Sequence, residues 1–449
     1  MVCRTGVRGR TASKPKNGMA NAATLSSTCP DQVGDQPLGG HIREFDGLRG
    51  LAILAVLLHH FWPTTGALAG WSTLPHLGWA GVDLFFVISG CLITGILLDS
   101  RGQRGALRNF YARRVIRIFP LYYLFVAAAF IVIPRLQGSS EFHDQSGSPW
   151  WYVLYLGNVR ESLTGHEPSY VLAVTWSLCI EEQFYLVFPL LVAMLSPARL
   201  RTLLWTLVVA APLVRCLTAL AWPDNERIQY LATPSRVDVL ALGCLIALGV
   251  RGHGWLPSRS TTRVLLPAAL VACAAAFAAG GLDRTTFFGR TLGYSLIALA
   301  ASALVLWTAQ RRHAHAAGWL RFRPLCTLGT LCYGIYLLQR PAQVVVGKLL
   351  AKLAPTVEIN GTAWGLLIFP LAAVAAATVS WFLLERPMLG LRRSFQGTSG
   401  KPAALATTNE SPTVAIEVEA RLPRPQRQPR FVAHSLTRWA QRYVGRTRE

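Results

Sequence analysis

Long apolar stretches alternate with short polar ones along most of this chain. A helix needs roughly 20 apolar residues to cross the hydrocarbon core of a bilayer, and the stretches are of about that length. The pattern predicts an all-α fold, a polytopic membrane helical bundle of about ten transmembrane helices. The expected spans are 48–64, 79–98, 117–137, 173–195, 201–221, 233–251, 264–282, 291–310, 327–350 and 362–384.

The basic residues between these spans predict how the bundle is oriented. Arginines crowd the loops after the second and eighth spans, whereas the loop after the first span has no Lys or Arg. Because cytoplasmic loops carry the excess of positive charge, we expect both termini in the cytoplasm and an even number of spans. The apolar segment WWYVLYLGNV (150–159) leaves an alternative open, since an extra short span there would invert everything downstream.

Composition agrees with a membrane protein. Of the 449 residues, 52% are hydrophobic and 15% are charged, whereas soluble proteins carry about 25% charged residues. The net charge of +22 lies mostly in loops and tails, so topology explains it better than nucleic-acid binding does. The nine cysteines form no C-x-x-C pair, and we expect neither a disulfide framework nor a metal site.

The two ends of the chain differ from its middle. Residues 1–40 are polar, small and basic without periodicity, and we expect a disordered N-terminal segment, with Met19 as an alternative start. Residues 396–449 are polar and basic and contain prolines, and this composition predicts a disordered cytoplasmic tail that contacts anionic membrane lipid. The membrane domain is expected to occupy residues 41–395.

Ionisable side chains inside a predicted span are costly, so each suggests a functional site. In RGLAILAVLLHH (49–60), Arg49 and His60 are eleven residues apart. On a helix they fall within about 20° of one face and about 16 Å apart along the axis. The structural alternative is a snorkelling arginine and an interfacial histidine near Trp62. We accept that alternative for His59 and favour a functional role for the Arg49–His60 pair.

Other spans also carry carboxylates. Asp83 and Ser89 fall in the second span, although helix packing explains Ser89 equally well and a helix cap would explain Asp83. The adjacent Glu181 and Glu182 fall in the fourth span, at the predicted depth of His60. Packing alone does not account for two adjacent carboxylates, so we expect one of them to face the bundle interior.

Arginines are predicted to gather at the opposite, cytoplasmic end. In FYARRVIRIFP (110–120), Arg114 and Arg117 are three residues apart and near the level of Arg49. Guanidinium groups at this spacing suit a phosphate-bearing ligand. We explain the neighbouring Arg113 as a positive-inside anchor.

Four further residues are candidates for binding the substrate. Arg236 and Asp238 open the sixth span and would either bind the acceptor or pair with each other. Tyr185 and Gln339 add hydrogen-bonding groups at mid-membrane depth.

The polar positions therefore predict two poles. Arginines lie at the cytoplasmic mouth, and His60, Glu181 and Asp83 lie toward the outer side. A base and a carboxylate about 16 Å from an anion-binding group fit a long phosphorylated donor that threads through the bundle. Acyl-CoA matches this description, since it has phosphates at one end and a thioester at the other.

The same residues resemble acyltransferase family 3, the integral membrane O-acyltransferases that modify cell-surface carbohydrates. The resemblance covers about residues 42–395, and its motifs follow the family's order: FDGLRGLAILAVLLHH, GVDLFFVISGCLIT, FYARRVIRIFP, TWSLCIEEQFYLVFP, SRVDVLALGCLIA, LCYGIYLLQRP and LERPMLGL. It implies transfer of an acyl group, often acetyl, from cytoplasmic acyl-CoA to a hydroxyl of a carbohydrate or related acceptor.

The resemblance also assigns roles to residues. His60 matches the catalytic base, and Glu181 matches an essential acidic position. Many members have a histidine where this chain has Gln339, which cannot titrate. The residues that the resemblance assigns to donor binding are Arg49, Arg114 and Arg117.

We therefore expect a bacterial inner-membrane O-acyltransferase. Its donor would be acetyl-CoA or another acyl-CoA, and its acceptor a polysaccharide, oligosaccharide or lipid-linked glycan. We expect no metal and no nucleic-acid partner. His60, supported by Glu181 or Asp83, would remove the proton of the acceptor hydroxyl. Direct transfer and an acyl-enzyme, for instance on Ser89, both stay open. A multi-span transporter of a carbohydrate or acyl-bearing solute is the alternative reading, and a non-catalytic glycan-binding relative is the third.

Overall fold

The computed structural model describes residues 42–72, 75, 77–137, 139–312, 314–355 and 359–391, and every regular element within them is helical. The expected segments 1–40 and 396–449 lie outside the described residues. The α-helices are α1 (Arg43–Phe61), α3 (Ala80–Asp99), α4 (Ala106–Ile131), α5 (Ile133–Gln137), α6 (Ser139–Ser146), α7 (Trp150–Val153), α8 (Gly157–Thr164), α9 (Thr175–Met194), α10 (Pro197–Ala221), α11 (Arg227–Leu231), α12 (Thr233–Val250), α13 (Arg259–Ala278), α14 (Tyr294–Arg311), α15 (Arg323–Leu353), α16 (Ala363–Ser380) and α17 (Arg386–Leu391). The shorter helical turns are η2 (Ala69–Trp71), η3 (Leu77–Trp79), η4 (Leu172–Val174), η5 (Gly289–Gly293), η6 (His315–Arg321) and η7 (Trp381–Glu385).

Within the described part of the chain, eight helical stretches are long and apolar enough to cross a membrane. They coincide with eight of the ten predicted spans. These stretches are Leu77–Asp99, Ala106–Arg135, Leu172–Met194, Pro197–Ala221, Arg227–Val250, Arg259–Ala278, Gly289–Arg311 and Ala363–Leu391. The other two predicted spans are the helices α1 and α15, which are not among the eight, so the count of ten and the orientation of the termini stay predictions.

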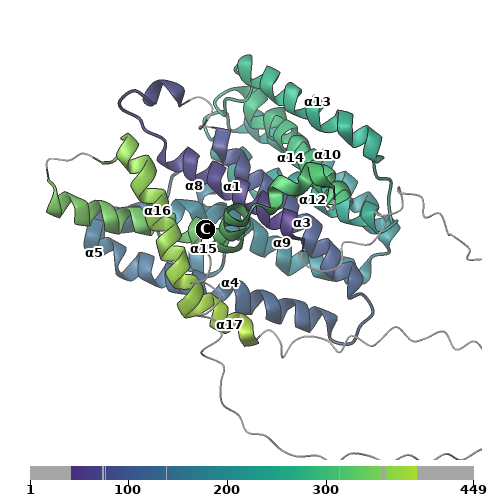
Figure 1. The fold of residues 1–449 in the computed structure, drawn as a ribbon, viewed down its shortest axis with the longest axis horizontal. Coiled ribbons are helices and arrows are strands. Elements are labelled where there is room, and N and C mark those ends of the chain that lie inside the picture. The colour runs from purple at the N-terminus through teal and green to yellow at the C-terminus, as the bar shows by residue number, and fades with distance from the viewer. Residues whose placement is uncertain are drawn as a thin grey trace, which may run out of the picture. The chain divides into compact units, whose positions relative to one another are not determined.

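Helices α1 and α15 differ from the eight because polar residues interrupt them. Arg43, Glu44, Asp46 and Arg49 all fall within the first two turns of α1, and α15 carries Arg340 near its middle. The two helices pack along each other, and α1 also packs against α3 (Figure 1). Glu44 and Asp46 are buried and Arg49 and Arg340 are partly buried, so protein surroundings receive these four charges, whereas Arg43 at the start of α1 is exposed.

The segment WWYVLYLGNV does not form a span. It contributes α7 and α8, which are four and eight residues long. A helix needs about 20 residues to cross the hydrocarbon core, so the alternative of an extra span here is wrong. Helix α4, in contrast, begins at Ala106, earlier than the predicted span at 117, and thus carries Arg114 and Arg117 on regular helix.

Glycines let the central helices approach each other closely. A Cβ atom on Gly329 of α15 would lie 1.8 Å from the carbonyl oxygen of Asp46 on α1, and one on Gly50 would lie 2.1 Å from that of Leu325. Gly90 of α3 approaches α12 in the same way. Such contacts of backbone against backbone are typical of helices packed in membranes, where small residues form the interface.

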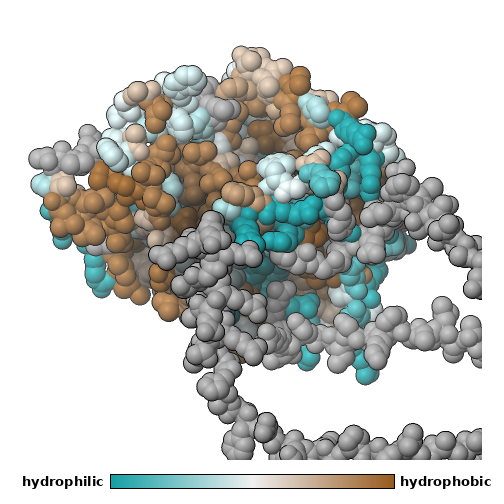
Figure 2. Space-filling view, viewed as in Figure 1, coloured by the Kyte–Doolittle hydropathy of each residue, from teal (hydrophilic) through white to brown (hydrophobic). Residues whose placement is uncertain are grey.

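Apolar side chains cover much of the face shown in Figure 2. On α13 only Thr262 is buried, and α16 is similarly exposed. The large exposed apolar side chains of these two helices are Val264, Leu265, Leu270, Val271, Trp364, Leu367, Leu371 and Val379. An apolar surface of this extent is typical of a membrane-embedded protein, in which lipid covers these side chains.

Candidate active site

Among the described residues, three cavities lie next to one another inside the bundle. The His60 cavity has a volume of about 570 Å³, and the Glu181 cavity, of about 90 Å³, shares Val82 and Tyr336 with it. The arginine cavity, of about 410 Å³, adjoins the Glu181 cavity. The side chains common to the Glu181 and arginine cavities are Arg49, Arg114 and Arg117. The two predicted poles therefore line adjacent cavities, with the small Glu181 cavity between them.

His60 lies in the last turn of α1 and is held by Gln339 of α15. The Nδ1 atom of His60 is 2.9 Å from the Oε1 atom of Gln339. The Nε2 atom of Gln339 donates to the carbonyl oxygen of Tyr336 at 2.9 Å, which fixes the orientation of the amide and leaves Oε1 as an acceptor. Nδ1 of a neutral His60 therefore carries the proton, and Nε2 has the lone pair that a general base needs.

Gln339 does not line the His60 cavity, although the sequence marks it as a substrate-binding residue. Its side chain is fully buried and contacts His60 instead. The geometry thus gives Gln339 a positioning role, which an amide fills without titrating.

Glu181 lies in the Glu181 cavity and is bonded to Ser89. The Oγ atom of Ser89 on α3 donates to Oε1 of Glu181 on α9 at 2.7 Å. Tyr185, one turn further along α9, lines the same cavity, whereas Glu182 does not. The expectation that one of the two glutamates faces the bundle interior is met by Glu181. The hydrogen bond also orients Ser89 toward a carboxylate, so Ser89 does more than allow close packing.

The arginine cavity gathers cations from several helices. The Arg114 guanidinium lies over the Tyr185 ring, 4.8 Å from its centroid, and Arg49 forms a long ion pair of 3.4 Å with Asp46. Within the described residues, neither Arg114 nor Arg117 forms an ion pair with a carboxylate. Guanidinium groups held in a cavity without carboxylate partners can bind phosphates. The arginines that line this cavity are Arg49, Arg113, Arg114, Arg117 and Arg251.

Asp83, Arg236 and Asp238 lie outside the three cavities. Arg236 forms an ion pair with Asp83, and Arg215 of α10 forms one of 2.8 Å with Asp238. All four side chains are buried. Each arginine pairs with a carboxylate of its own, and no ion pair among the described residues joins Arg236 to Asp238. The Arg236 guanidinium lies 4.9 Å from the centroid of the Tyr294 ring, which does line the His60 cavity. This network therefore supports the cavity wall from behind.

We expect the single substitutions Asp83→Leu and Arg236→Met each to destabilise the protein by about 3–5 kcal/mol, because each leaves one charge buried without its partner. The double substitution should recover part of that loss, since it removes both charges. Thermal unfolding in detergent measures the stabilities, and the turnover of the folded fraction measures activity. A normal melting temperature with lost turnover in Asp83→Leu would instead assign Asp83 to the chemistry.

Sequence reasoning missed most of the wall of the His60 cavity. Arg340 lines it and lies over the Tyr170 ring at 3.9 Å from the centroid, and its place next to Gln339 in LLQRP was the available signal. Glu161 and Arg227 come from the short helices α8 and α11, outside the spans that the sequence predicts, and carry no periodic signal. The aromatic residues in the wall are Trp79, Tyr170, Trp176, Tyr230, Tyr294 and Tyr336.

Comparisons with known proteins indicate a single family. A family model described as an acyltransferase domain matches residues 42–386. The chain is 29% identical over 369 residues to YrhL of Bacillus subtilis (strain 168), covering 78% of this chain and 55% of that protein. It is 28% identical over 385 residues to the peptidoglycan O-acetyltransferase OatA of Listeria monocytogenes, covering 80% and 58%.

A further relative is the O-acetyltransferase OatA of Staphylococcus aureus, 28% identical over 324 residues, with 68% of this chain and 51% of that protein covered. The chain thus spans about half the length of the curated relatives it matches. No solved structure matches it.

Proposed function

Because the chain belongs to acyltransferase family 3, we propose that it is a membrane O-acyltransferase that moves an acyl group, in the first instance acetyl, from acyl-CoA to a hydroxyl of a cell-surface carbohydrate. The observation that carries this proposal is the row of three adjacent cavities, with five arginines in the wall at one end and His60 in the wall at the other. In the proposed orientation the arginine cavity opens toward the cytoplasm of the bacterial inner membrane, and the His60 cavity opens toward the outer side.

The donor would bind with its phosphates in the arginine cavity. No carboxylate of the described residues forms an ion pair with Arg114 or Arg117, so both can bind phosphate oxygens through their guanidinium donors. The Glu181 cavity is about 90 Å³, a size that suits an extended arm rather than a bulky group. The thioester would then arrive near the wall that the Glu181 and His60 cavities share, at Tyr336.

The acceptor would bind in the His60 cavity, where Nε2 of His60 takes the proton of its hydroxyl. The hydroxyl oxygen then attacks the thioester carbonyl, a C–O bond forms and the C–S bond breaks. The proton held by His60 passes to the leaving thiolate, so that the products are the O-acyl ester and free coenzyme A. Glu181, with its hydrogen bond from Ser89, would orient the donor arm in the middle cavity.

A carbohydrate is the acceptor class that the comparisons favour, since one relative is named as a peptidoglycan O-acetyltransferase. The experiment is to supply purified protein in nanodiscs with acetyl-CoA and soluble peptidoglycan fragments. Free thiol and acetylated glycan are measured together, and equal amounts of both are expected. Protein that releases no thiol, but moves the glycan across a liposome membrane, would favour the transporter reading instead.

A further inference from the structure

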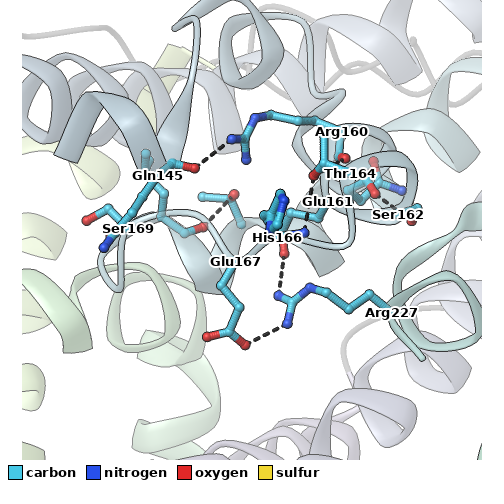
Figure 3. Close-up of polar contacts among 12 residues, drawn as sticks. Gln145, Arg160, Glu161, Ser162, Thr164, His166, Glu167, Ser169 and Arg227 are labelled. Atoms are coloured by element: carbon cyan, nitrogen blue, oxygen red, sulfur yellow. Dashed lines mark hydrogen bonds and ion pairs between the residues drawn. The ribbon is translucent and has the colours of Figure 1, made fainter. Parts of the chain in front are cut away.

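A charged network on α8 and α11 forms part of the wall of the His60 cavity (Figure 3). Arg227 bridges two carboxylates, with Nη2 at 3.1 Å from Oε2 of Glu161 and Nη1 at 2.6 Å from Oε1 of Glu167. Arg160, next to Glu161 in the chain, reaches away and donates to the carbonyl oxygen of Gln145 at 2.6 Å (Figure 3). The cavity wall therefore presents a carboxylate that a single guanidinium holds.

Glu161 is the unusual member of this network because it is buried and only half satisfied. The residue is 1% exposed, and its Oε1 atom has no hydrogen-bond partner among the described residues. Burial raises the pKa of Glu161 to about 7, against the opposing effect of the Arg227 charge. Buried carboxylate oxygens normally accept a hydrogen bond, and Glu161 lines the His60 cavity, so its unpartnered Oε1 has the capacity to accept a hydrogen bond from a ligand there.

An aromatic surface adjoins this carboxylate in the same cavity. The rings of Trp176 and Tyr230 are 4.6 Å apart between centroids, and the Trp79 ring lies 5.4 Å from that of Tyr294. Tyr230 and Tyr294 join the two pairs at 5.6 Å. Apolar ring faces next to a few placed polar groups match the C–H face and the hydroxyl edge of a sugar ring.

The charges in the wall of the His60 cavity balance. Leaving His59 and His60 aside, the wall has as many carboxylates as guanidiniums. The carboxylates are Glu161, Glu167 and Glu226, and the guanidiniums are Arg227, Arg284 and Arg340. The arginine cavity, in contrast, carries an excess of cations. The balance favours an uncharged ligand in the His60 cavity, whereas a phosphate group is favoured in the arginine cavity.

We propose that Glu161 and this aromatic surface form the acceptor subsite, which binds a neutral, hydroxyl-rich sugar ring. The ring packs on Trp176 and Tyr230, and one of its hydroxyl groups donates a hydrogen bond to Oε1 of Glu161. His60 acts on a different hydroxyl of the acceptor in the same cavity. This inference rests on the proposed function and specifies which part of the molecule selects the acceptor.

The test measures binding of the tetrasaccharide of N-acetylglucosamine to the full chain in nanodiscs by calorimetry. Glu161→Gln is expected to weaken this binding by about 10- to 100-fold, the usual loss for a hydrogen bond to a charged group. Binding of acetyl-CoA, measured on the same samples, should stay within about twofold, because the arginine cavity is untouched. Retained donor binding also shows that the variant is folded.

Glu167→Gln is the matched control, since Glu167 bonds to the same guanidinium but its side chain is 75% exposed. We expect less than about a threefold change, as for other exposed ion pairs. Equal effects of the two substitutions would overturn the proposal, because they would place the effect in Arg227 rather than in the buried oxygen of Glu161.

Monodeoxy analogues of the tetrasaccharide give a second readout that needs only the wild-type protein. The wild type should bind one analogue about 10- to 100-fold more weakly than the parent tetrasaccharide. Glu161→Gln should bind that analogue and the parent equally well. Equal binding of all analogues by the wild type would overturn the subsite. If the protein cleaved acetyl-CoA but bound no tetrasaccharide, the subsite alone would be overturned. If the protein failed both to bind and to cleave acetyl-CoA, the proposed function itself would be overturned.

Discussion

His60→Ala is expected to lower the turnover number for acyl transfer by about 10²- to 10⁴-fold, the usual contribution of a positioned general base. The Gln339 amide makes Nδ1 of His60 the protonated nitrogen, so that the base is Nε2, and alanine has no replacement for it. The KM for acetyl-CoA should change little, because the arginines that would bind the donor line other cavities. The initial rate of thiol release with a saturating carbohydrate acceptor measures the effect.

His59→Ala is the matched control, because His59 is adjacent in the chain and lines the same cavity. It should keep most of the turnover. Gln339→Leu is expected to give an intermediate loss of about tenfold, since His60 would keep its place but lose the hydrogen bond that sets its tautomer. Equal losses in His59→Ala and His60→Ala would place the effect in the packing of α1, and unchanged turnover in His60→Ala would rule out His60 as the base.

Arg117→Ala is expected to raise the KM for acetyl-CoA by about 10- to 100-fold, with a smaller effect on the turnover number. Arg117 lines both the Glu181 and arginine cavities and has no carboxylate partner among the described residues, so its guanidinium is available to a phosphate. Adenosine 3′,5′-bisphosphate, which has phosphates but no thioester, should compete with acetyl-CoA for the wild type and compete less well for the variant.

Arg108→Ala serves as the control on the same helix, because Arg108 is exposed and does not line the arginine cavity. It should leave the KM for acetyl-CoA within about twofold. If Arg108→Ala and Arg117→Ala raised KM equally, the effect would come from the general positive charge of this end of the bundle. An unchanged KM in Arg117→Ala would contradict donor binding in the arginine cavity.

The length of the apolar stretches predicted eight helices that are long and apolar enough to cross a membrane, because hydrocarbon imposes length and composition on any segment that faces it. It left an alternative open at WWYVLYLGNV, which contributes to two short helices, with Tyr152 and Tyr155 buried and Trp150 and Leu154 exposed. It was also weakest for α1 and α15, which carry charged residues that are buried or partly buried in the protein, among them Glu44, Asp46 and Arg340. These two helices carry His60, Arg49 and Gln339, so the elements that composition describes least well are those that form the candidate site.

The site itself was predicted in part. The expectation that Arg49, Arg114 and Arg117 come together is met in the arginine cavity, because all three lie at one predicted depth. Depth alone did not reveal that Asp83 faces α12 rather than His60, since its partner Arg236 is distant in sequence. One error was avoidable: residues two apart on a helix point in different directions, so Arg236 and Asp238 were poor candidates for a pair.

The glycine contacts between α1 and α15 lie far from the His60 cavity, yet they set the helix register on which the hydrogen bond between Gln339 and His60 depends. Gly329 touches the α1 backbone ten residues, or about 15 Å, before Gln339 along α15. A slip of one residue between the two helices would turn Gln339 by about 100° away from His60. The backbone contacts at Gly329 and Gly50 oppose that slip. The register of α1 against α15, set near one end of the bundle, therefore determines which nitrogen of the His60 imidazole carries its proton near the other end.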